Sequence, residues 1–525
     1  MHLLFNARIY TFDRRFPLAS ALAIEGERII AVGGDELLSQ YPQAERQDMH
    51  QAIVLPGLTD AHIHIQHYVL SLQKIDCELP TKEQILARVA QAAKRARPGE
   101  WIIGHGWNQN TWGGTWPTAV DLDAVAPLNP VYLTAKSLHA GWANSLALRY
   151  AKLEKFRHDP RAQHIQRNKR GKPTGILFEG AMALMEAAIP LPGAEQLAEM
   201  IRQALPTLWK IGLTGIHNFD RSLSFRALQI LNKRGELRLR VLQSIPGEDL
   251  QDVLRLGLRG GWGDDHLRIG PLKLFSDGAL GPRTAAMLEP YVDAPENRGI
   301  LLMNAEEIFA YGREAARAGL NLAVHAIGDR ANREVLNAFE RLRAYEKEHG
   351  LPALRHRIEH VQLLHPDDAH RLAALELVAS MQPIHATSDM EMAERGWGKR
   401  AALAYAWKTQ LAAGARLAFG SDAPVENPNP FWGLHAAVTR RRADGAPAAE
   451  GWYPQERLTV QEALEAYTLG PAYAAGWEDR LGRLTEGYLA DLIVLESDPF
   501  TCPPEELRSL QPIATMIGGE WVWRA

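Results

Sequence analysis

Cysteine is nearly absent from this chain: Cys77 and Cys502 are the two cysteines among 525 residues, and they form no CxxC pair. This scarcity excludes a disulfide framework, which small secreted domains use in place of a large core. It also argues against a thiolate metal site. We therefore interpret both residues as reduced thiols.

Long apolar runs and an excess of basic charge are absent too. No apolar stretch reaches ~18 residues, and the first residues lack the basic start, apolar run and small-residue cleavage site of a secretory signal. The 58 basic and 62 acidic residues are spread along the chain, so no extended basic surface is available for phosphates. We expect a cytoplasmic protein that binds neither nucleic acid nor membranes and acts on a small-molecule substrate.

Several catalytic signatures are missing as well. The sequence has no GxSxG motif, and neither cysteine lies in a context typical of a nucleophile. No loop has the glycine spacing that cradles a dinucleotide or a triphosphate. These absences disfavour serine or cysteine nucleophiles, nicotinamide chemistry and ATP chemistry.

What is present predicts more than one domain, because single cores stop growing near ~250–300 residues. Residues 1–57 and 476–525 show short runs in which apolar and polar residues alternate, a pattern typical of antiparallel strands. The two ends of the chain are therefore predicted to build one small β-domain together. Apolar residues make up 46% of the chain and charged residues 23%, which is ordinary for a folded globular protein.

Between these ends, short β-branched runs alternate with amphipathic stretches of helix length, which indicates repeated βα units. Eight candidate strands lie at 57–64, 213–219, 238–245, 267–277, 321–326, 355–361, 377–383 and 416–422. Eight is the count of a closed (β/α)₈ barrel, here assigned to 58–66 and 186–475. Nearly 150 residues separate the first two strands, far more than a usual βα loop, so 67–185 is predicted to be an inserted subdomain over the barrel mouth.

Polar residues at the ends of these strands predict a metal site. His62 and His64 alternate along a strand, so both imidazoles lie on one face and can reach one ion. Such a pair alone is more often structural. Further candidates stand at the C-terminal ends of other strands, where barrel active sites are built: Lys273, His325, His360 and Asp422. Imidazole and carboxylate donors favour a catalytic Zn²⁺, with Fe²⁺, Mn²⁺ or Co²⁺ as substitutes.

Six motifs follow one another along the chain: VLPGLTDAHIH, KLFSDGALGPRTA, AVHAIGDRAN, RIEHVQL, FGSDAPV and GYLADLIVLE. In this order they resemble the amidohydrolase superfamily, and within it the YtcJ-like amidohydrolase 3 group, which includes N-substituted formamide deformylases. The resemblance covers essentially the whole chain. It implies an α/β fold with a (β/α)₈ TIM-type metallo-barrel, a composite β-sandwich from both termini and an inserted α+β subdomain.

The resemblance also implies roles for the candidate ligands. His62 and His64 would bind a more buried metal, and His325 and His360 an outer one. Lys273 matches a lysine that is carboxylated in similar proteins and bridges two metals, although it could instead be a barrel lysine paired with Asp277. Asp422 would bind the metal and carry a proton, and its alternative role is a helix cap. The number of ions and the carboxylation of Lys273 stay open.

This set of residues favours hydrolysis of a non-peptide C–N bond in an amide, an N-substituted formamide or a related compound. A divalent metal lowers the pKa of bound water to ~7 and polarises a carbonyl. Asp422 would take the proton from that water and deliver it to the departing amine. Two alternatives are a metal-assisted isomerase, lyase or decarboxylase, and a non-catalytic binding protein. Similar proteins often form homodimers, but the sequence identifies no interface.

Residues that would contact the substrate are harder to assign. Trp107 could form an aromatic wall, His139 and His217 could line a pocket, and Arg283 could bind a carboxylate or carbonyl oxygen. Each has an ordinary alternative: packing in the subdomain core for Trp107, a helix cap for His139, a structural histidine for His217 and an ion pair for Arg283. Three other histidines are interpreted as structural: His105, His385 and His435.

Overall fold

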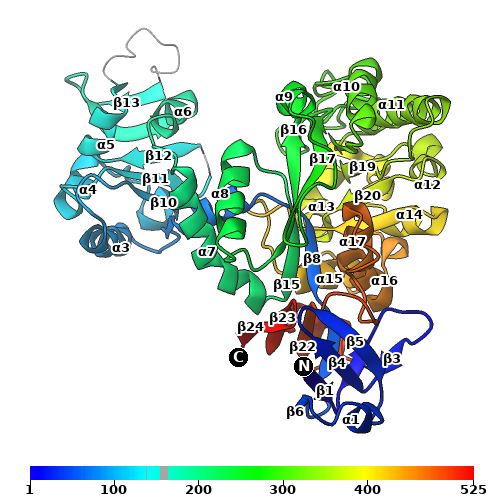
Figure 1. The fold of residues 1–525 in the computed structure, drawn as a ribbon. Coiled ribbons are helices and arrows are strands. Elements are labelled where there is room, and N and C mark those ends of the chain that lie inside the picture. The colour runs from blue at the N-terminus through cyan, green and yellow to red at the C-terminus, as the bar shows by residue number, and fades with distance from the viewer. Residues whose placement is uncertain (138, 154–163) are drawn as a thin grey trace. The chain divides into compact units, whose positions relative to one another are not determined.

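The computed structural model describes residues 1–137, 139–153 and 164–525 (Figure 1). Two compact units can be separated. One consists of Met1–Tyr68 and Ala194–Ala525, and the other of Val69–Gly193. The first unit contains a barrel and a β-sandwich, and the second is an α+β unit with a sheet of its own.

The barrel is a sheet of eight parallel strands, and its sheet order follows the sequence. Its strands are β8 (Leu58–Ile63), β15 (Leu213–Asn218), β16 (Arg240–Pro246), β17 (Leu267–Phe275), β18 (Leu322–Ala326), β19 (Arg357–His360), β20 (Val378–Met381) and β21 (Arg416–Phe419). The two edge strands meet beyond β21, where Asp422 N donates to His62 O at 2.7 Å and His64 N donates to Ala423 O at 2.9 Å. All eight predicted strands are confirmed, and so is the (β/α)₈ fold.

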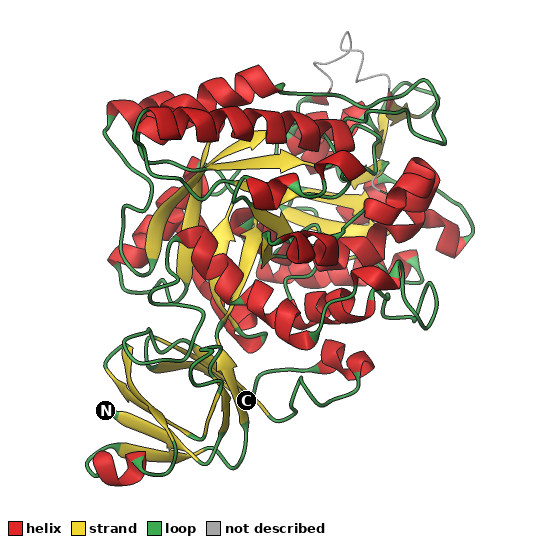
Figure 2. Cartoon of the chain, turned by 90° about the vertical axis from the view of Figure 1, so that its right-hand side faces the viewer, coloured by secondary structure: helices red, strands yellow, loops and turns green. Residues whose placement is uncertain are grey.

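Helices surround the barrel strands (Figure 2). They are α7 (Ala194–Lys210), α8 (Ser222–Lys233), α9 (Leu250–Arg255), α10 (Ala305–Arg317), α11 (Asp329–Glu348), α12 (Arg371–Ala374), α13 (Pro383–Trp397), α14 (Trp407–Ala413), α15 (Pro430–Thr439), α16 (Val460–Tyr467) and α17 (Leu469–Ala475). α11 shows why they pack on the sheet: Val335, Phe339 and Leu342 form a buried stripe at helical spacing. Asn304 and Glu307 form a capping box that starts α10.

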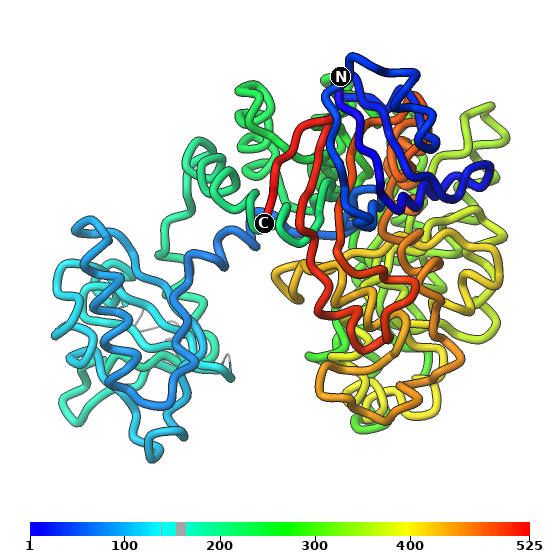
Figure 3. The backbone as a smooth tube through the Cα atoms, turned by 90° about the horizontal axis from the view of Figure 1, so that it is seen from below, coloured from blue at the N-terminus to red at the C-terminus, as the bar shows by residue number. Residues whose placement is uncertain are grey.

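Both ends of the chain build the β-sandwich, as predicted, and the N- and C-terminal segments run side by side there (Figure 3). One sheet has the order β5 (Arg28–Gly33), β4 (Ala21–Glu25), β1 (His2–Phe5) and β6 (Glu45–Asp48), with α1 (Leu37–Gln40) beside it. The other has the order β24 (Glu520–Arg524), β23 (Ala514–Ile517), β22 (Leu492–Leu495), β7 (Ile53–Pro56), β2 (Arg8–Tyr10) and β3 (Leu18–Ala19). The two sheets share one hydrophobic core, which includes Leu4, Leu22, Val54, Leu492 and Met516.

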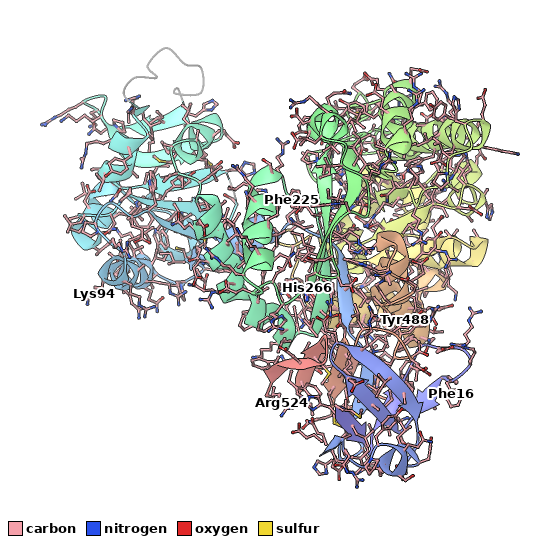
Figure 4. The ribbon with its side chains drawn as sticks, in the orientation of Figure 1. Phe16, Lys94, Phe225, His266, Tyr488 and Arg524 are labelled. Atoms are coloured by element: carbon pink, nitrogen blue, oxygen red, sulfur yellow. The ribbon has the colours of Figure 1, made fainter. Side chains whose placement is uncertain are left out.

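The sandwich is also tied to the barrel within the first unit. Arg240, the first residue of β16, pairs with Asp491, which directly precedes β22. Tyr488, labelled in Figure 4, accepts a hydrogen bond at its carbonyl oxygen from Ile29 N of β5 at 2.9 Å. The sequence between the last barrel helix and β22 is therefore held to both parts by polar contacts.

The second unit contains one six-stranded sheet and short helices. The sheet has the order β13 (Ile165–Arg167), β14 (Pro173–Phe178), β12 (Ala140–Ala143), β11 (Val131–Ala135), β10 (Ile102–Trp107) and β9 (Ile75–Asp76). Its helices are α3 (Lys82–Arg95), α4 (Ala119–Val125), α5 (Ser145–Tyr150) and α6 (Gly180–Glu186), and α2 (Ile65–Leu72) crosses the boundary between the units. Among the helices of the described residues, none is both long and apolar enough to cross a membrane.

Candidate metal centre

The strand ends at one mouth of the barrel bring three possible metal ligands together. His62 lies in β8, His360 ends β19, and Asp422 follows β21. Ligand atoms of these three side chains all lie within 4.8 Å of one another. His62 Nε2 is 3.6 Å from Asp422 Oδ1, and His64 Nε2 is 3.3 Å from the same oxygen. His64, directly after β8, therefore adds a fourth donor to this cluster.

His325, in β18, faces the same cluster from the neighbouring strand. Its ring centroid is 4.6 Å from that of His360, and the two planes are nearly perpendicular at 70°. Its Nε2 lies 2.9 Å from Gly278 O. Since a carbonyl oxygen only accepts, Nε2 carries the hydrogen, and the lone pair of His325 is on Nδ1.

Two other histidines are held by acceptors on one nitrogen, which frees the other nitrogen. His62 Nδ1 is 2.6 Å from Glu359 Oε2, and His360 Nδ1 is 2.8 Å from Gln382 Oε1. Both oxygens accept a hydrogen from the ring, so the Nε2 lone pairs of His62 and His360 are available. This arrangement, in which an outer acceptor fixes the tautomer and orientation of a ring, is typical of metal-binding histidines.

The electrostatic surroundings keep three of the rings neutral. Burial lowers the pKa of His62 to about 4, although Glu359 opposes the shift. Burial and nearby Lys273 lower the pKa of His325 to about 3. Burial and His325 place the pKa of His360 well below its ordinary value. A neutral imidazole is the form that donates a lone pair to a metal.

His64 behaves differently because two carboxylates lie beside it. Burial alone would lower the pKa of His64, but Asp220 and Asp422 outweigh burial and raise the pKa to about 9. Its Nδ1 is 3.3 Å from Asp220 Oδ1. This position therefore attracts positive charge, and a divalent cation would supply that charge in place of the proton.

Lys273 lies in β17 with its ammonium group inside the barrel. The residue is 5% exposed, and its Nζ has no hydrogen-bond partner in the described part of the chain. Burial lowers the pKa of Lys273 to about 8, while Glu359 and Asp422 oppose the shift. Asp277, considered above as a structural partner for Lys273, instead accepts from the backbone N–H groups of Ile327, Gly328 and Ala286.

Asp422 is anionic and does not cap a helix. Burial by itself would raise its pKa, but the hydrogen bond with His64 and the nearby His62 and His360 hold that pKa well below the ordinary value. The next helix, α15, is capped by Asn429. Asp422 and His360 both have positive φ, at 60° and 77°. Such strained backbone in non-glycine residues is typical of functional sites, where the surrounding structure maintains it.

The donor set fits a divalent metal on observations of this structure. Neutral imidazoles with fixed tautomers, an anionic carboxylate and an unpaired buried Lys273 nitrogen converge at one mouth. Unpaired buried polar groups are costly, so a cluster of them indicates a missing partner. His62, His64, His360 and Asp422 are the residues that would hold an ion most directly.

Sequence reasoning missed the residues that orient these ligands. Glu359 holds His62, Gln382 holds His360, and Asp220 holds His64. A signal existed for one of them: Arg357 and Glu359 alternate within the fully buried strand RIEH, so they share a face of the strand. Buried charged residues on a barrel strand indicate a polar interior, and here Arg357 Nη2 donates to Glu359 Oε2 at 3.1 Å.

The structure gives the four proposed substrate-contacting residues other partners. Trp107 is 0% exposed and donates its indole N–H to Leu133 O in the core of the second unit. His139, in the same unit, is exposed and lies 2.8 Å from Glu179 Oε1, while Asn144 caps the following helix. Arg283 pairs with Asp293, the alternative considered for it.

His217, the fourth of these residues, lies inside the barrel. Its Nδ1 accepts a hydrogen bond from Arg357 Nη1 at 2.9 Å. It also lines a cavity of about 10 Å³ together with Thr214 and Arg240, on the side of the sandwich. A cavity of this size holds roughly one water molecule, so His217 does not line a substrate pocket there.

Comparison with known proteins agrees with this geometry. The model of the amidohydrolase family matches residues 45–523. The chain belongs to the amidohydrolase family. This match covers the whole barrel, the second unit and the part of the sandwich from β6 onward, so it confirms the resemblance that the six motifs indicated.

Relatives of this amidohydrolase span its full length. It is 32% identical over 527 residues to the putative amidohydrolase YtcJ of Bacillus subtilis (strain 168), which covers 98% of each chain. It is 29% identical over 539 residues to the N-substituted formamide deformylase of Arthrobacter pascens, which covers 98% of this chain and 97% of that one.

A solved structure is similar as well. An uncharacterized metal-dependent hydrolase from Pyrococcus furiosus superposes with a TM-score of 0.80 at 30% identity, covering 95% of this chain and all of that one. Together with the family match, this likeness makes the chain a hydrolase of the amidohydrolase family.

Proposed function

We propose that this amidohydrolase cleaves a non-peptide C–N bond of an amide, with an N-substituted formamide as the first candidate substrate. The observation that carries the proposal is the cluster of His62, His360 and Asp422, whose ligand atoms lie within 4.8 Å of one another. The formamide assignment is supported by the similarity to the Arthrobacter pascens enzyme. The ion that we propose is Zn²⁺, in one or two copies, because imidazole and carboxylate are its usual donors in catalytic sites.

A divalent ion held by these residues would supply a Lewis acid that polarises the substrate carbonyl and acidifies water. Asp422 is the base in this proposal because its low pKa keeps it anionic. It accepts a proton as the water oxygen bonds to the carbonyl carbon. It then returns the proton to the leaving nitrogen as the C–N bond breaks, so that water and amide become an acid and an amine. Such a general acid–base role contributes typically 10²–10⁴-fold.

Lys273 is proposed to become a carboxylated ligand. Its pKa of about 8 means that roughly a tenth of the side chain is a neutral amine at pH 7, far more than for an ordinary lysine. A neutral amine can add to carbon dioxide and form a carbamate, which would place an anionic oxygen donor at an otherwise unpaired nitrogen. Nζ is buried and lies 4.8 Å from the ring centroids of both Phe219 and Phe275.

The test uses zinc-reconstituted protein and matched pairs of N-substituted formamides and acetamides. The proposal predicts that amine and carboxylic acid appear in equal amounts, faster for formamides than for acetamides. With zinc in excess, D422N is expected to lose turnover, and D444N, which changes an exposed carboxylate, is the control. A product with the same elemental composition as the substrate would instead favour an isomerase. Release of carbon dioxide would favour a decarboxylase.

A further inference from the structure

One barrel strand, β20, contributes no ligand to the cluster described above, yet its C-terminal end carries a buried histidine. Gln382 follows β20 and Pro383 begins α13, so His385 lies in the first turn of that helix. Gln382 already accepts the hydrogen bond of His360. The connection from β20 to α13 therefore lies beside the ligand cluster, and His385 lies just after this connection.

His385 is 6% exposed, and its Nε2 is buried without a hydrogen-bond partner among the described residues. This Nε2 lies 3.9 Å from Asp422 Oδ2. Its ring is stacked parallel to that of His360, with centroids 6.2 Å apart and planes 16° apart. His385 thus belongs to the same mouth as the proposed base.

The gap of 3.9 Å is too long for a direct hydrogen bond, whose usual length is ~2.7–3.2 Å. It is short enough that one atom can lie within ~2.9 Å of both Nε2 and Oδ2. Leaving a buried ring nitrogen unpaired costs free energy, so this position favours a bound partner. By contrast, buried His356 is satisfied on both sides: Nδ1 accepts from Leu322 N, and Nε2 lies 2.8 Å from Glu346 Oε1.

The neighbouring carboxylate decides what kind of atom fits. A carboxylate oxygen accepts hydrogen bonds, so a hydrogen on the facing nitrogen of His385 suits this position and a lone pair does not, which makes Nε2–H a donor. The atom between them must accept from Nε2–H and donate to Oδ2. A hydroxylic oxygen does both, and water is the hydroxylic oxygen that the hydrolytic reaction needs.

We infer that His385 is a further catalytic residue, which holds the attacking water against Asp422. Its Nε2–H donates to the water oxygen while the water donates to Asp422 Oδ2. When the oxygen bonds to the carbonyl carbon, the proton passes to Asp422 and the carbonyl π pair moves to the carbonyl oxygen. His385 keeps its hydrogen bond to the new hydroxyl group of the tetrahedral adduct. This inference rests on the proposed function of the same site.

The first test measures kcat and KM of zinc-loaded variants on the formamide that the wild type cleaves. H385A is expected to lower kcat about 100-fold with KM changed less than about threefold, because the contact forms at the reacting oxygen. H385Q, whose amide N–H can reach the position of Nε2, is expected to recover about tenfold of that loss. H435A is the control, because His435 is also a buried histidine with an unpaired nitrogen, but its charged neighbours are Arg508, Arg441 and Glu505.

The second test needs no turnover. Phenylboronic acid adds hydroxide to become tetrahedral, so it presents hydroxyl groups like those of the adduct. Calorimetry is expected to show at least tenfold weaker binding to zinc-loaded H385A than to the wild type, an intermediate loss in H385Q and none in H435A. Zinc content measured in the same samples should be equal in all four proteins.

The outcomes separate this inference from the proposed function. Wild-type protein that cleaves no amide but binds the boronic acid in a His385-dependent way would overturn the substrate proposal alone. Amide cleavage with equal kcat and equal boronic acid binding in H385A would overturn the inference alone. Loss of zinc in H385A would make His385 a metal ligand and would also overturn it.

Discussion

The two ends of the barrel use charged residues in opposite ways. At the end that faces the sandwich, Arg240 and Asp491 form a buried pair with two contacts of 2.9 Å, and Asp491 Oδ1 also accepts from Gly518 N at 2.7 Å. At the mouth, Lys273 and His385 keep buried nitrogens without partners in the part of the chain that the structure describes. The Arg240–Asp491 pair at one end is held by direct contacts and stabilises the chain, whereas two basic side chains at the mouth are left free for ligands.

The first prediction changes the mouth without harming the fold. D422N should lower kcat by about 10²–10⁴-fold, because the amide cannot accept the proton of the attacking water. Its thermal unfolding midpoint should fall only slightly, because the amide keeps the size of the carboxylate while it loses the charge that the fold stabilises. Steady-state kinetics and calorimetry check both parts, and a large drop in the midpoint would show that Asp422 serves stability.

The second prediction changes the opposite end. D491A should destabilise the protein by about 3–5 kcal/mol, because it leaves Arg240 buried with its main partner removed. Denaturant unfolding of the metal-free protein measures the change. E199A, which breaks an exposed pair with Arg202, should leave stability nearly unchanged. A small effect of D491A would remove the contrast between the two ends.

The third prediction concerns the pH dependence of stability at Lys273. Its pKa is lowered from 10.5 to about 8 in the fold, so the unfolded chain binds more protons between these pH values. The free energy of unfolding of the wild type should therefore rise by about 3 kcal/mol relative to that of K273M as the pH rises from 8 to 10.5. Urea unfolding of metal-free protein in carbonate-free buffer at several pH values measures this, and parallel pH profiles would contradict it.

The smallest expected effect comes from a residue that acts through a ligand. E359Q should weaken zinc binding about 10–100-fold, because the amide fixes the His62 tautomer less strongly than a carboxylate does. Competition with a chromophoric chelator measures the affinity. E506Q, which alters an exposed carboxylate in the C-terminal segment, is the control. Unchanged affinity in E359Q would limit its role to barrel packing with Arg357.

The barrel could be predicted from the sequence because its eight strands are short β-branched runs separated by amphipathic helices. His62, His360 and Asp422 could be predicted because each stands at the end of such a strand. The partners of these ligands could not, since they depend on which strands become neighbours: Glu359 is 297 residues from His62, and Asp220 is 156 residues from His64.

Histidines without a strand-end signal were the hardest to assign. His385 was interpreted as structural, and its proximity to Asp422 becomes visible only in the structure. Trp107 and Arg283 form the contacts of the ordinary alternatives considered for them, packing in the core of the second unit and an ion pair with Asp293. Local sequence predicts which residues can do chemistry, but three-dimensional neighbours decide which of them are left free.

The most direct test of the account is the zinc content of the wild type, H62A, H360A and H435A, purified without chelator and measured by elemental analysis. The account predicts one or two equivalents in the wild type and in H435A, with a sharp loss in H62A and H360A while all four proteins stay folded. Equal zinc in all four, or none in the folded wild type, would contradict a metal centre at this mouth of the barrel.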